Sequence, residues 1–313
     1  RAMKRTKTFT FFVCPLPVFL LWLGGCMEII DVKLSSTEVR LVVDARFTDE
    51  VKSHIVKLSR TCDYFDPHTD SLGVRGAEVY VTDAQGLRID FSPVDTMPGW
   101  YASAPDVSGR SGETYSLHIW ADADGDGVRE YYETGNETMP FMPTIDSVKA
   151  VYGYSMPPFY TGDRKGWNIL LYAMDPPTKE YCGFSYAVNG KVYEDSISNI
   201  FLFPDNFSSG VYLRGVALYC LPDTTEVNKH LVKVFVYEGD TVSVLGYSFT
   251  EGYSNYISEV RSALSSNIPV FSGAPSNIKG NISNNAFGYF AVYSVEKASC
   301  IVKKQTAPMP FKR

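Results

Sequence analysis

Residues 76–87 read GAEVYVTDAQGL, and this stretch predicts two strands joined by a tight turn. Val79 and Val81 alternate with more polar side chains, which is the period of two that places apolar groups on one face of a strand. Asp83 and Gly86 are residue types that favour turns, and Leu87 begins the second strand. The stretch therefore predicts a hairpin with one buried face.

Similar alternating segments lie on both sides of this hairpin. They cover residues 39–47, 53–60 and 115–121, and the Pro98-Gly99 turn opens a further strand. About six strands at spacings of roughly 8 to 15 residues, with turn residues between them and no helical periodicity, indicate a Greek-key sandwich of immunoglobulin-like size. We therefore predict an all-β fold with an immunoglobulin-like β-sandwich at residues 39–134.

The second half of the chain is again rich in predicted strands. Gly135, Pro140 and Pro143 interrupt residues 135–147, which are therefore expected to form a linker to a C-terminal β-rich domain at residues 148–304. The strands expected in that domain cover residues 148–154, 167–174, 181–188, 211–220, 231–238, 242–249, 287–295 and 300–303.

One short helix is expected within the C-terminal domain. Ser254 or Asn255 is the predicted N-cap, because both side chains accept hydrogen bonds from a helix N-terminus. The apolar residues Ile257, Val260 and Leu264 follow at helical spacing, and Asn267 with Pro269 ends the pattern.

The first 25 residues have the features of a bacterial lipoprotein signal peptide. Lys4, Arg5 and Lys7 form a basic segment, and the 15 residues of Phe9–Leu23 carry no charge. A membrane-spanning helix needs ~20 apolar residues, so this run is too short to remain as a span. The sequence LGGC ends at Cys26, whose thiol is the expected site of lipidation.

These features predict a lipid-anchored protein of the outer membrane, at the cell surface. Residues 26–38 are expected to form a lipidated tether, and residues 305–313 a C-terminal tail. Removing residues 1–25, which carry four positive charges and no acid, changes the formal net charge from −6 to −10. A chain this acidic is a poor nucleic-acid binder, because nucleic-acid binding requires a basic face.

Four cysteines remain if Cys26 is lipidated and Cys14 is removed with the signal peptide: Cys62, Cys182, Cys220 and Cys300. An even number in an oxidising compartment permits two disulfides, with three possible connectivities. Cys182 with Cys220 is the favoured pair, because both lie in predicted strands of one domain. Four buried thiols that pack as small apolar groups are the alternative.

The sharpest local motif is the acidic, glycine-rich segment Asp122–Glu133. Asp122, Asp124, Asp126 and Glu133 occupy positions 1, 3, 5 and 12, with glycine at position 6, as in a twelve-residue calcium loop. A predicted strand, not a helix, leads into the segment, so a simple acidic turn between two strands is the alternative. We expect Ca²⁺ as the only cofactor.

Catalytic motifs are not found in this sequence. It contains no His-Glu-x-x-His, no Gly-x-Ser-x-Gly, no phosphate-binding loop and no dinucleotide fingerprint. The high aromatic content, with 21 Tyr, 19 Phe and 4 Trp, is the remaining functional indication. Tyr154, Tyr160 and Trp167 lie around the Pro157-Pro158 loop, where exposed rings can contact a partner protein or stack on sugars. Ordinary packing in a β-sandwich is the alternative.

Cys26 is followed by six segments whose order and spacing are shared with a known family: residues 41–47, 76–79, 98–101, 145–148, 275–282 and 288–290. In these features the chain resembles a Bacteroidota lipoprotein family of unknown function that commonly accompanies a TonB-dependent outer-membrane transporter. The resemblance implies an envelope location and an N-terminal immunoglobulin-like or carboxypeptidase-regulatory-like β-domain. It implies no catalytic residues.

We therefore expect a non-enzymatic lipoprotein that acts as an accessory or binding partner of a TonB-dependent transporter in nutrient uptake. The expected partners are outer-membrane lipid, through Cys26, the transporter, and a glycan or peptide ligand. A carbohydrate-binding or adhesion lipoprotein that uses the aromatic loops is the alternative. An envelope hydrolase with a site assembled from dispersed residues is a third hypothesis.

Overall fold

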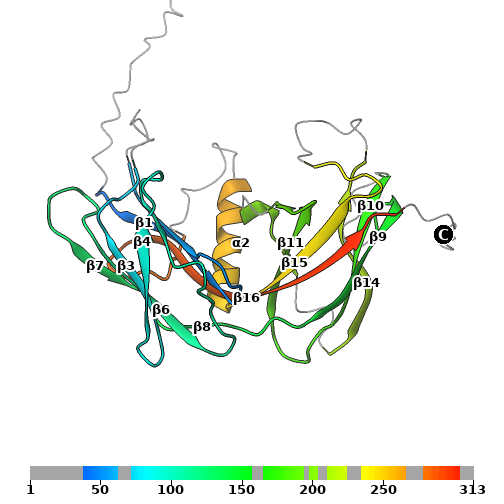
Figure 1. Cartoon of the computed structure of the whole chain (residues 1–313), viewed down its shortest axis with the longest axis horizontal. Helices are drawn as coiled ribbons and strands as arrows, with labels where there is room; N and C mark the ends of the chain where they lie inside the picture. The colour runs from blue at the N-terminus through cyan, green and yellow to red at the C-terminus, as the bar shows by residue number, and fades with distance from the viewer. Residues whose placement is uncertain are drawn as a thin grey trace, which may run out of the picture. The chain divides into compact units, whose positions relative to one another are not determined.

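The computed structural model describes residues 38–62, 72–156, 165–193, 197–203, 210–223, 234–265 and 278–303 (Figure 1). In these residues the fold is all-β with one α-helix, as predicted. Its elements, in chain order, are β1 (Leu41–Thr48), β2 (Ile55–Arg60), β3 (Glu78–Asp83), β4 (Arg88–Pro93), β5 (Trp100–Ala102), β6 (Thr114–Ala121), β7 (Glu130–Glu133), β8 (Glu137–Thr138), β9 (Ile145–Tyr154), β10 (Lys165–Met174), β11 (Tyr181–Val188), β12 (Lys191–Val192), the 3-10 helix η3 (Ile197–Asn199), β13 (Phe201–Phe203), β14 (Tyr212–Leu221), β15 (Thr241–Phe249), α2 (Glu251–Ser265) and β16 (Phe287–Ile301).

The strands form one sheet of 13 strands and a second sheet of three. The main order in the large sheet is β12-β11-β15-β16-β1-β2-β5-β4-β3-β6-β7, with β13 paired to β11 and β8 paired to β6. The small sheet has the order β14-β10-β9. The signal peptide, the tether and Cys26 lie outside the described residues.

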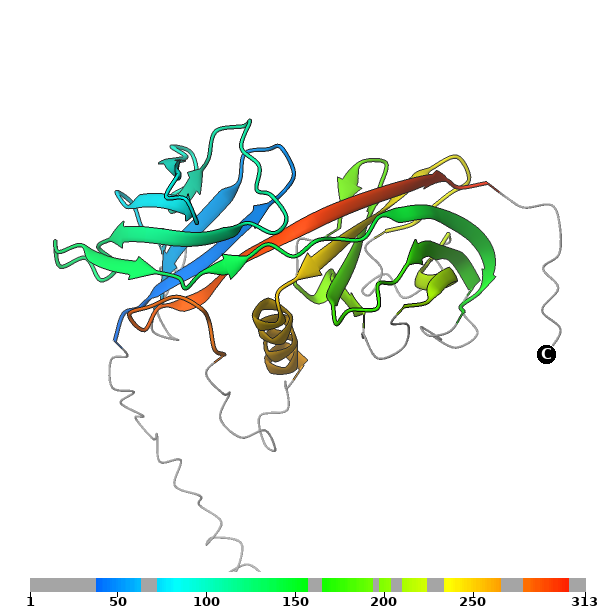
Figure 2. The same ribbon diagram turned by 90° about the horizontal axis from the view of Figure 1, so that it is seen from below.

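The last strand, β16, joins the two halves of the large sheet. Its first part runs parallel to β1, with pairs from Val42↔Phe287 to Thr48↔Tyr293, and its second part runs antiparallel to β15. Figures 1 and 2 show this long strand passing from β1 to β15. The two closing strands predicted at 287–295 and 300–303 are therefore one continuous strand. The first half of β16 pairs with β1 and contributes to the core of the N-terminal strands. The expected N-terminal domain at residues 39–134 does not include this segment.

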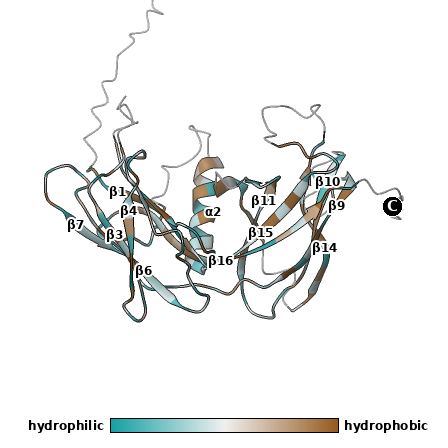
Figure 3. Cartoon of the chain, in the orientation of Figure 1, coloured by the Kyte–Doolittle hydropathy of each residue, from teal (hydrophilic) through white to brown (hydrophobic). Residues whose placement is uncertain are grey.

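The buried core beneath β1 shows the expected alternation. Leu41, Val43, Ala45 and Phe47 are buried while the residues between them are more exposed. Phe290 of β16 is buried in the same cluster. Figure 3 shows the matching alternation of apolar and polar residues along the strands. Segments far apart in the sequence therefore complete one core, which stabilises the fold by removing apolar area from water.

The helix begins earlier than the sequence predicts. Thr250 is the N-cap, since its Oγ1 accepts a hydrogen bond from the Tyr253 amide at 3.3 Å, so the predicted cap at Ser254 or Asn255 is wrong. Tyr253 and Ile257 are buried in a cluster with rings from β15 and β16. The predicted apolar face ran to Leu264, but that residue is 54% exposed and is not part of the buried cluster.

Two further expectations are corrected in the C-terminal half. The described part of the predicted strand at 231–238, residues 234–238, is not a strand, although Val234 and Val236 are buried in the second core. The Val236 amide donates to the Pro222 carbonyl at 2.9 Å, so one backbone hydrogen bond and apolar packing both hold this segment. Cys182 and Cys220 are thiols, so the favoured disulfide between them is wrong for this structure. Cys62 and Cys300 are also thiols, and burial raises the pKa of Cys300.

The histidine at the start of β2 makes the stability of the fold depend on pH. His54 is 1% exposed and packs against Phe47, with ring centroids 4.7 Å apart and planes tilted by 48°. Its Nδ1 has no hydrogen-bond partner among the described residues. Burial, with a smaller effect of Lys52, lowers the pKa of His54 from 6.5 to about 4. The unfolded chain therefore takes up a proton at a higher pH than the folded chain does.

We predict that the free energy of unfolding falls as the pH is lowered from about 6.5 to about 4. The full contribution of His54 is about 3 kcal/mol, from a pKa difference of two to three units. Denaturant unfolding at several pH values, for the wild type and His54→Gln, measures it. The difference in stability between the two proteins should change across this window, and a constant difference would contradict the prediction.

Candidate functional site

The outward face of β3, β6 and β7 carries a continuous row of stacked side chains. The rings of Tyr80 and His118 stack with centroids 4.8 Å apart and planes at 18°, and His118 stacks on Tyr131 at 6.2 Å. Trp120 then packs against Tyr131 at 4.8 Å. At the other end, the Arg88 guanidinium lies 3.8 Å from the centre of the Tyr80 ring. We call these five side chains the aromatic row.

The register of the sheet explains why the row is continuous. Tyr80 lies opposite His118, and Trp120 lies opposite Tyr131, so these side chains stand on the same face of neighbouring strands. Directly opposed side chains on one face of a sheet contact each other. The inward residues between them, such as Ile119, are buried in the first core. The row is therefore the solvent side of a sheet whose other side is packed.

A chain of hydrogen bonds crosses the row. The Tyr131 hydroxyl donates to Glu133 Oε2 at 3.0 Å, and His118 Nδ1 lies 2.7 Å from the same hydroxyl. His118 Nε2 lies 2.8 Å from Thr82 Oγ1. These distances assign the proton to Nδ1, which donates to Tyr131, and leave Nε2 to accept from Thr82. The chain fixes the ring orientations from β3 to β7.

The two groups at the centre of this series of hydrogen bonds, His118 and Tyr131, are uncharged at pH 7. Burial lowers the pKa of His118, an effect that Glu133 opposes and Arg88 reinforces, so the imidazole is neutral at pH 7. Burial and the hydrogen bond to Glu133 raise the pKa of Tyr131 to about 12. Arg88 at the end of the row is held by Glu78 at 2.8 Å and Asp90 at 2.6 Å. The row thus presents neutral rings with charges at its ends.

The loop between β6 and β7 holds the acidic motif next to the row. Asp122, Asp124 and Asp126 each place a carboxylate oxygen within 4.8 Å of the others. Backbone amides of the loop donate to all three, including Gly125 to Asp122 at 2.7 Å and Val128 to Asp126 at 2.7 Å. These bonds orient the carboxylates, and Ala123, which is 3% exposed, anchors the loop in the core. The structure therefore brings together three of the four predicted calcium ligands.

The fourth predicted ligand, Glu133, lies outside this group. Its carboxylate bonds Tyr131, and it lies opposite His118 on the outward face. Glu130 lies closer to the loop: its Oε2 is buried and has no hydrogen-bond partner in the described part of the chain. Burial and the carboxylates of Glu130, Asp124 and Asp122 raise the pKa of the Tyr132 phenol to about 12. Glu130 stands at position 9 of the motif, a position that also supplies ligands in calcium loops.

The predicted aromatic contact residues differ in their exposure to solvent. Tyr154 is 57% exposed, and the Lys165 ammonium lies 4.7 Å from the centre of its ring. Trp167 is only 4% exposed and packs edge-on against Tyr152 in the second core, so it offers no face to a ligand. Tyr160 lies outside the described residues.

The sequence does contain a signal for the aromatic row. Tyr80-x-Thr82, His118-x-Trp120 and Tyr131-x-Glu133 each place two side chains, polar or aromatic, at the spacing of one strand face. Only the order of the strands in the sheet, which pairing at long range determines, brings the three pairs side by side.

The loop geometry leads to a prediction for calcium. If the loop binds Ca²⁺, millimolar Ca²⁺ should raise the melting temperature, because the ion binds only the folded state. A dissociation constant of ~10⁻⁴ to 10⁻³ M is expected, as for extracellular modules. Calorimetric titration of the wild type and Asp124→Ala measures this. Loss of the binding heat in the variant supports the site, whereas equal heat in both proteins, or none in either, excludes it.

A comparison with models of protein families places the chain in a family. A family model described as "Domain of unknown function (DUF4249)" matches residues 27–299. No curated protein matches the chain. Among the described residues, none of the helices combines the length and apolar character that crossing a membrane would require.

Proposed function

We propose that this chain, which belongs to the DUF4249 family, is a non-enzymatic outer-membrane lipoprotein that acts as an accessory partner of a TonB-dependent transporter in nutrient uptake. The binding role rests on the aromatic row, and the membrane location rests on the signal-peptide pattern before Cys26. The association with a transporter comes from the resemblance of the chain to Bacteroidota lipoproteins.

The observation that carries the binding role is the composition and rigidity of the aromatic row. Tyr, Trp and Arg are the residue types that contribute most to protein interfaces when they are held in place. Trp120 is 40% exposed, and hydrogen bonds and stacking fix its neighbours Tyr131 and His118. Rings that are already ordered lose little conformational freedom on binding. An ordered face of this kind favours contact with another protein.

The proposed location is supported by the extent of the family match. The match begins at residue 27, directly after the expected lipidation site at Cys26. The basic segment and the apolar run lie before it. Cleavage before Cys26 would separate the signal-peptide pattern at residues 1–25 from the part of the chain that matches the family. Several acyl chains would give durable attachment to the membrane, because each buried CH₂ contributes ~0.8 kcal/mol.

Calcium has a structural role in this proposal. The carboxylates of Asp122, Asp124 and Asp126 lie in the loop that joins β6 to β7, the strands that carry Trp120 and Tyr131. An ion held there would neutralise the carboxylates and restrict the hairpin. Ca²⁺ would therefore stiffen the binding face without contacting the partner.

Co-purification tests the proposed partner. The native chain, with an affinity tag at its C-terminus, is extracted from outer membranes in mild detergent and purified, and its companions are identified by mass spectrometry. A stable complex buries roughly 1,200 Å² or more and survives dilution. The proposal expects a TonB-dependent transporter at near-equal amount, and purification of the chain alone would contradict it.

The second candidate function is carbohydrate binding. It is favoured by Tyr154, whose exposed ring lies beside Lys165 and can stack on a sugar. A glycan microarray distinguishes the two functions, because carbohydrate binding predicts signals that fall in Tyr154→Ala, and the accessory role does not require them.

A further inference from the structure

Strand β4 continues past the end of its neighbour β5. The two strands pair only at Ser92↔Ala102 and Pro93↔Tyr101, with a further bond from the Val94 amide to the Trp100 carbonyl at 2.8 Å. Continued pairing would place Asp90 opposite Ala104, but β5 ends at Ala102. The first part of β4 therefore pairs with β3 on one side only.

The chain after β5 is held away from β4 by other contacts. Ser103 donates from its amide to the His54 carbonyl at 3.0 Å, and Lys52 donates to the Val107 carbonyl at 3.1 Å. Ser53 adds a bond from its hydroxyl to the Ser103 carbonyl at 2.7 Å. Residues 103–107 thus follow the segment before β2, which leaves a gap beside β4.

The alternation of backbone groups shows which of them face this gap. The Leu87 carbonyl accepts a hydrogen bond from the Asp83 amide, so the backbone groups of odd-numbered residues face β3. The Val94 amide donates to the Trp100 carbonyl, so the backbone groups of even-numbered residues of β4 face away from β3. Arg88 and Asp90 are the two even-numbered residues that β5 does not reach. Within the described residues, no backbone group forms a hydrogen bond with the amides or carbonyls of Arg88 and Asp90 on the side of β5.

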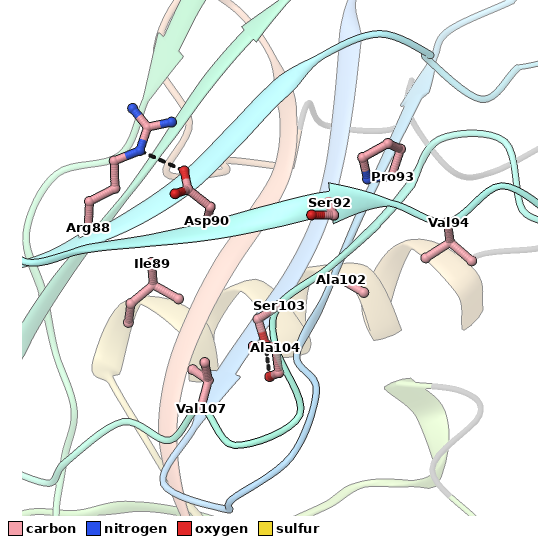
Figure 4. A pocket seen from close by; sticks show the side chains of 10 residues that line it. All are labelled: Arg88, Ile89, Asp90, Ser92, Pro93, Val94, Ala102, Ser103, Ala104 and Val107. Carbon is pink, nitrogen blue, oxygen red and sulfur yellow. Dashed lines mark hydrogen bonds and ion pairs between the residues drawn. The ribbon is translucent and has the colours of Figure 1, made fainter.

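A hollow of about 630 Å³ lies at the same place. Figure 4 shows Arg88, Asp90 and Ser92 along β4 above it, with Ile89 and Val107 extending into it from opposite sides. Apolar side chains thus line the interior while backbone donors and acceptors line one wall. This combination fits an extended peptide, which needs a hydrogen-bonding edge for its backbone and an apolar pocket for alternate side chains.

The charges around the hollow indicate the kind of peptide. Arg88 is paired with both Glu78 and Asp90, so two carboxylates share one guanidinium. Asp106, in the segment opposite, is exposed and adds another acid. The surroundings are therefore net negative, and they favour a segment with a Lys or Arg next to its apolar side chain.

We propose that the free edge of β4 at Arg88–Asp90 binds an extended, basic-apolar peptide segment by strand addition, in the place that β5 leaves open. The edge offers two residues with outward backbone groups, which suits a bound segment of roughly four residues. This inference does not depend on the identity of the transporter, since it concerns peptide recognition by this chain alone.

The test uses random linear dodecapeptides displayed on phage and selected on the purified chain from residue 27. The best enriched peptide is synthesised with a fluorophore, and its dissociation constant is measured by anisotropy. Asp90→Pro removes the edge amide without removing a bond to β3, and Asp90→Ala is the matched control that keeps the amide. Val107→Trp is a second variant, which fills the hollow.

We expect Asp90→Pro and Val107→Trp each to weaken binding at least about fivefold, because the first removes a hydrogen bond at the strand edge and the second fills the hollow. Asp90→Ala keeps the edge amide and removes one exposed carboxylate, so it should retain affinity for the same peptide within about threefold. Failure to enrich any peptide, or equal binding by the wild type and both Asp90→Pro and Val107→Trp, would overturn the proposal. If Asp90→Pro is unfolded, Val107→Trp decides. Neither result changes the outcome of the co-purification.

Discussion

Gly288→Ala is expected to abolish the folded protein. Gly288 has φ +98° and lies opposite Val43 in the parallel pairing of β1 with β16. A Cβ at this position would collide with the Val43 carbonyl oxygen, and that backbone cannot move without breaking the pairing. A left-handed backbone that disfavours alanine adds to the cost. The loss should exceed about 4 kcal/mol, most of the stability of an ordinary domain.

Gly153→Ala is the matched control for this prediction. Gly153 also lies in a strand, but a Cβ there would meet no atom within 4 Å, and no positive φ is recorded for it. This variant should therefore keep its stability within about 1 kcal/mol. Yield of soluble protein and thermal unfolding by circular dichroism measure both variants. A Gly288→Ala protein that melts within a few degrees of the wild type would show that β16 does not pack against β1 as described.

Cys26→Ala is expected to release the protein from the membrane almost completely. The thiol of Cys26 is the proposed attachment point for the acyl chains, and no other residue near it can replace the thiol. Without lipid the mature chain is acidic and has no predicted apolar span. Fractionation of cells, followed by immunoblotting of the soluble and membrane fractions, gives the distribution. The wild type should remain with the membrane through a high-salt wash.

Cys14→Ala provides the control, because Cys14 lies within the predicted apolar run and should be removed with it. Its distribution should match the wild type, with labelled palmitate incorporated in both proteins and absent from Cys26→Ala. Incorporation that survives in Cys26→Ala would refute the proposed anchor.

Much of the fold could be predicted from local patterns. The hairpin at residues 76–87 is found as β3 and β4, and the predicted strands around it correspond to β1, β2, β5 and β6. The joining role of β16 could not be predicted, because a parallel partner far away in sequence leaves no periodic signal in either strand. Gly288 permits that pairing, because a side chain at this position would collide with the Val43 backbone. The helix start was misplaced because Ser254 and Asn255 were taken as the candidate caps, whereas the Thr250 side chain accepts the hydrogen bond at the helix N-terminus.

The candidate site was predicted only in part. Motif spacing brought together Asp122, Asp124 and Asp126, which are local in sequence. The spacing also predicted Glu133 as a ligand, and the structure places its carboxylate on the Tyr131 hydroxyl, outside the group of three aspartates. The aromatic row could not be predicted, because it depends on the neighbours that β6 acquires in the sheet.

The most direct test of the central claim is the affinity of the purified chain for the transporter that the proposal expects to co-purify with it, measured by biolayer interferometry. Trp120→Ala and Tyr131→Ala each remove one ring of a packed pair in the aromatic row. Tyr237→Ala, at a residue elsewhere that is 53% exposed, is the matched control. The account predicts a loss of affinity of more than about tenfold for the two row variants, with the control unchanged. Equal affinities for all four proteins would contradict it.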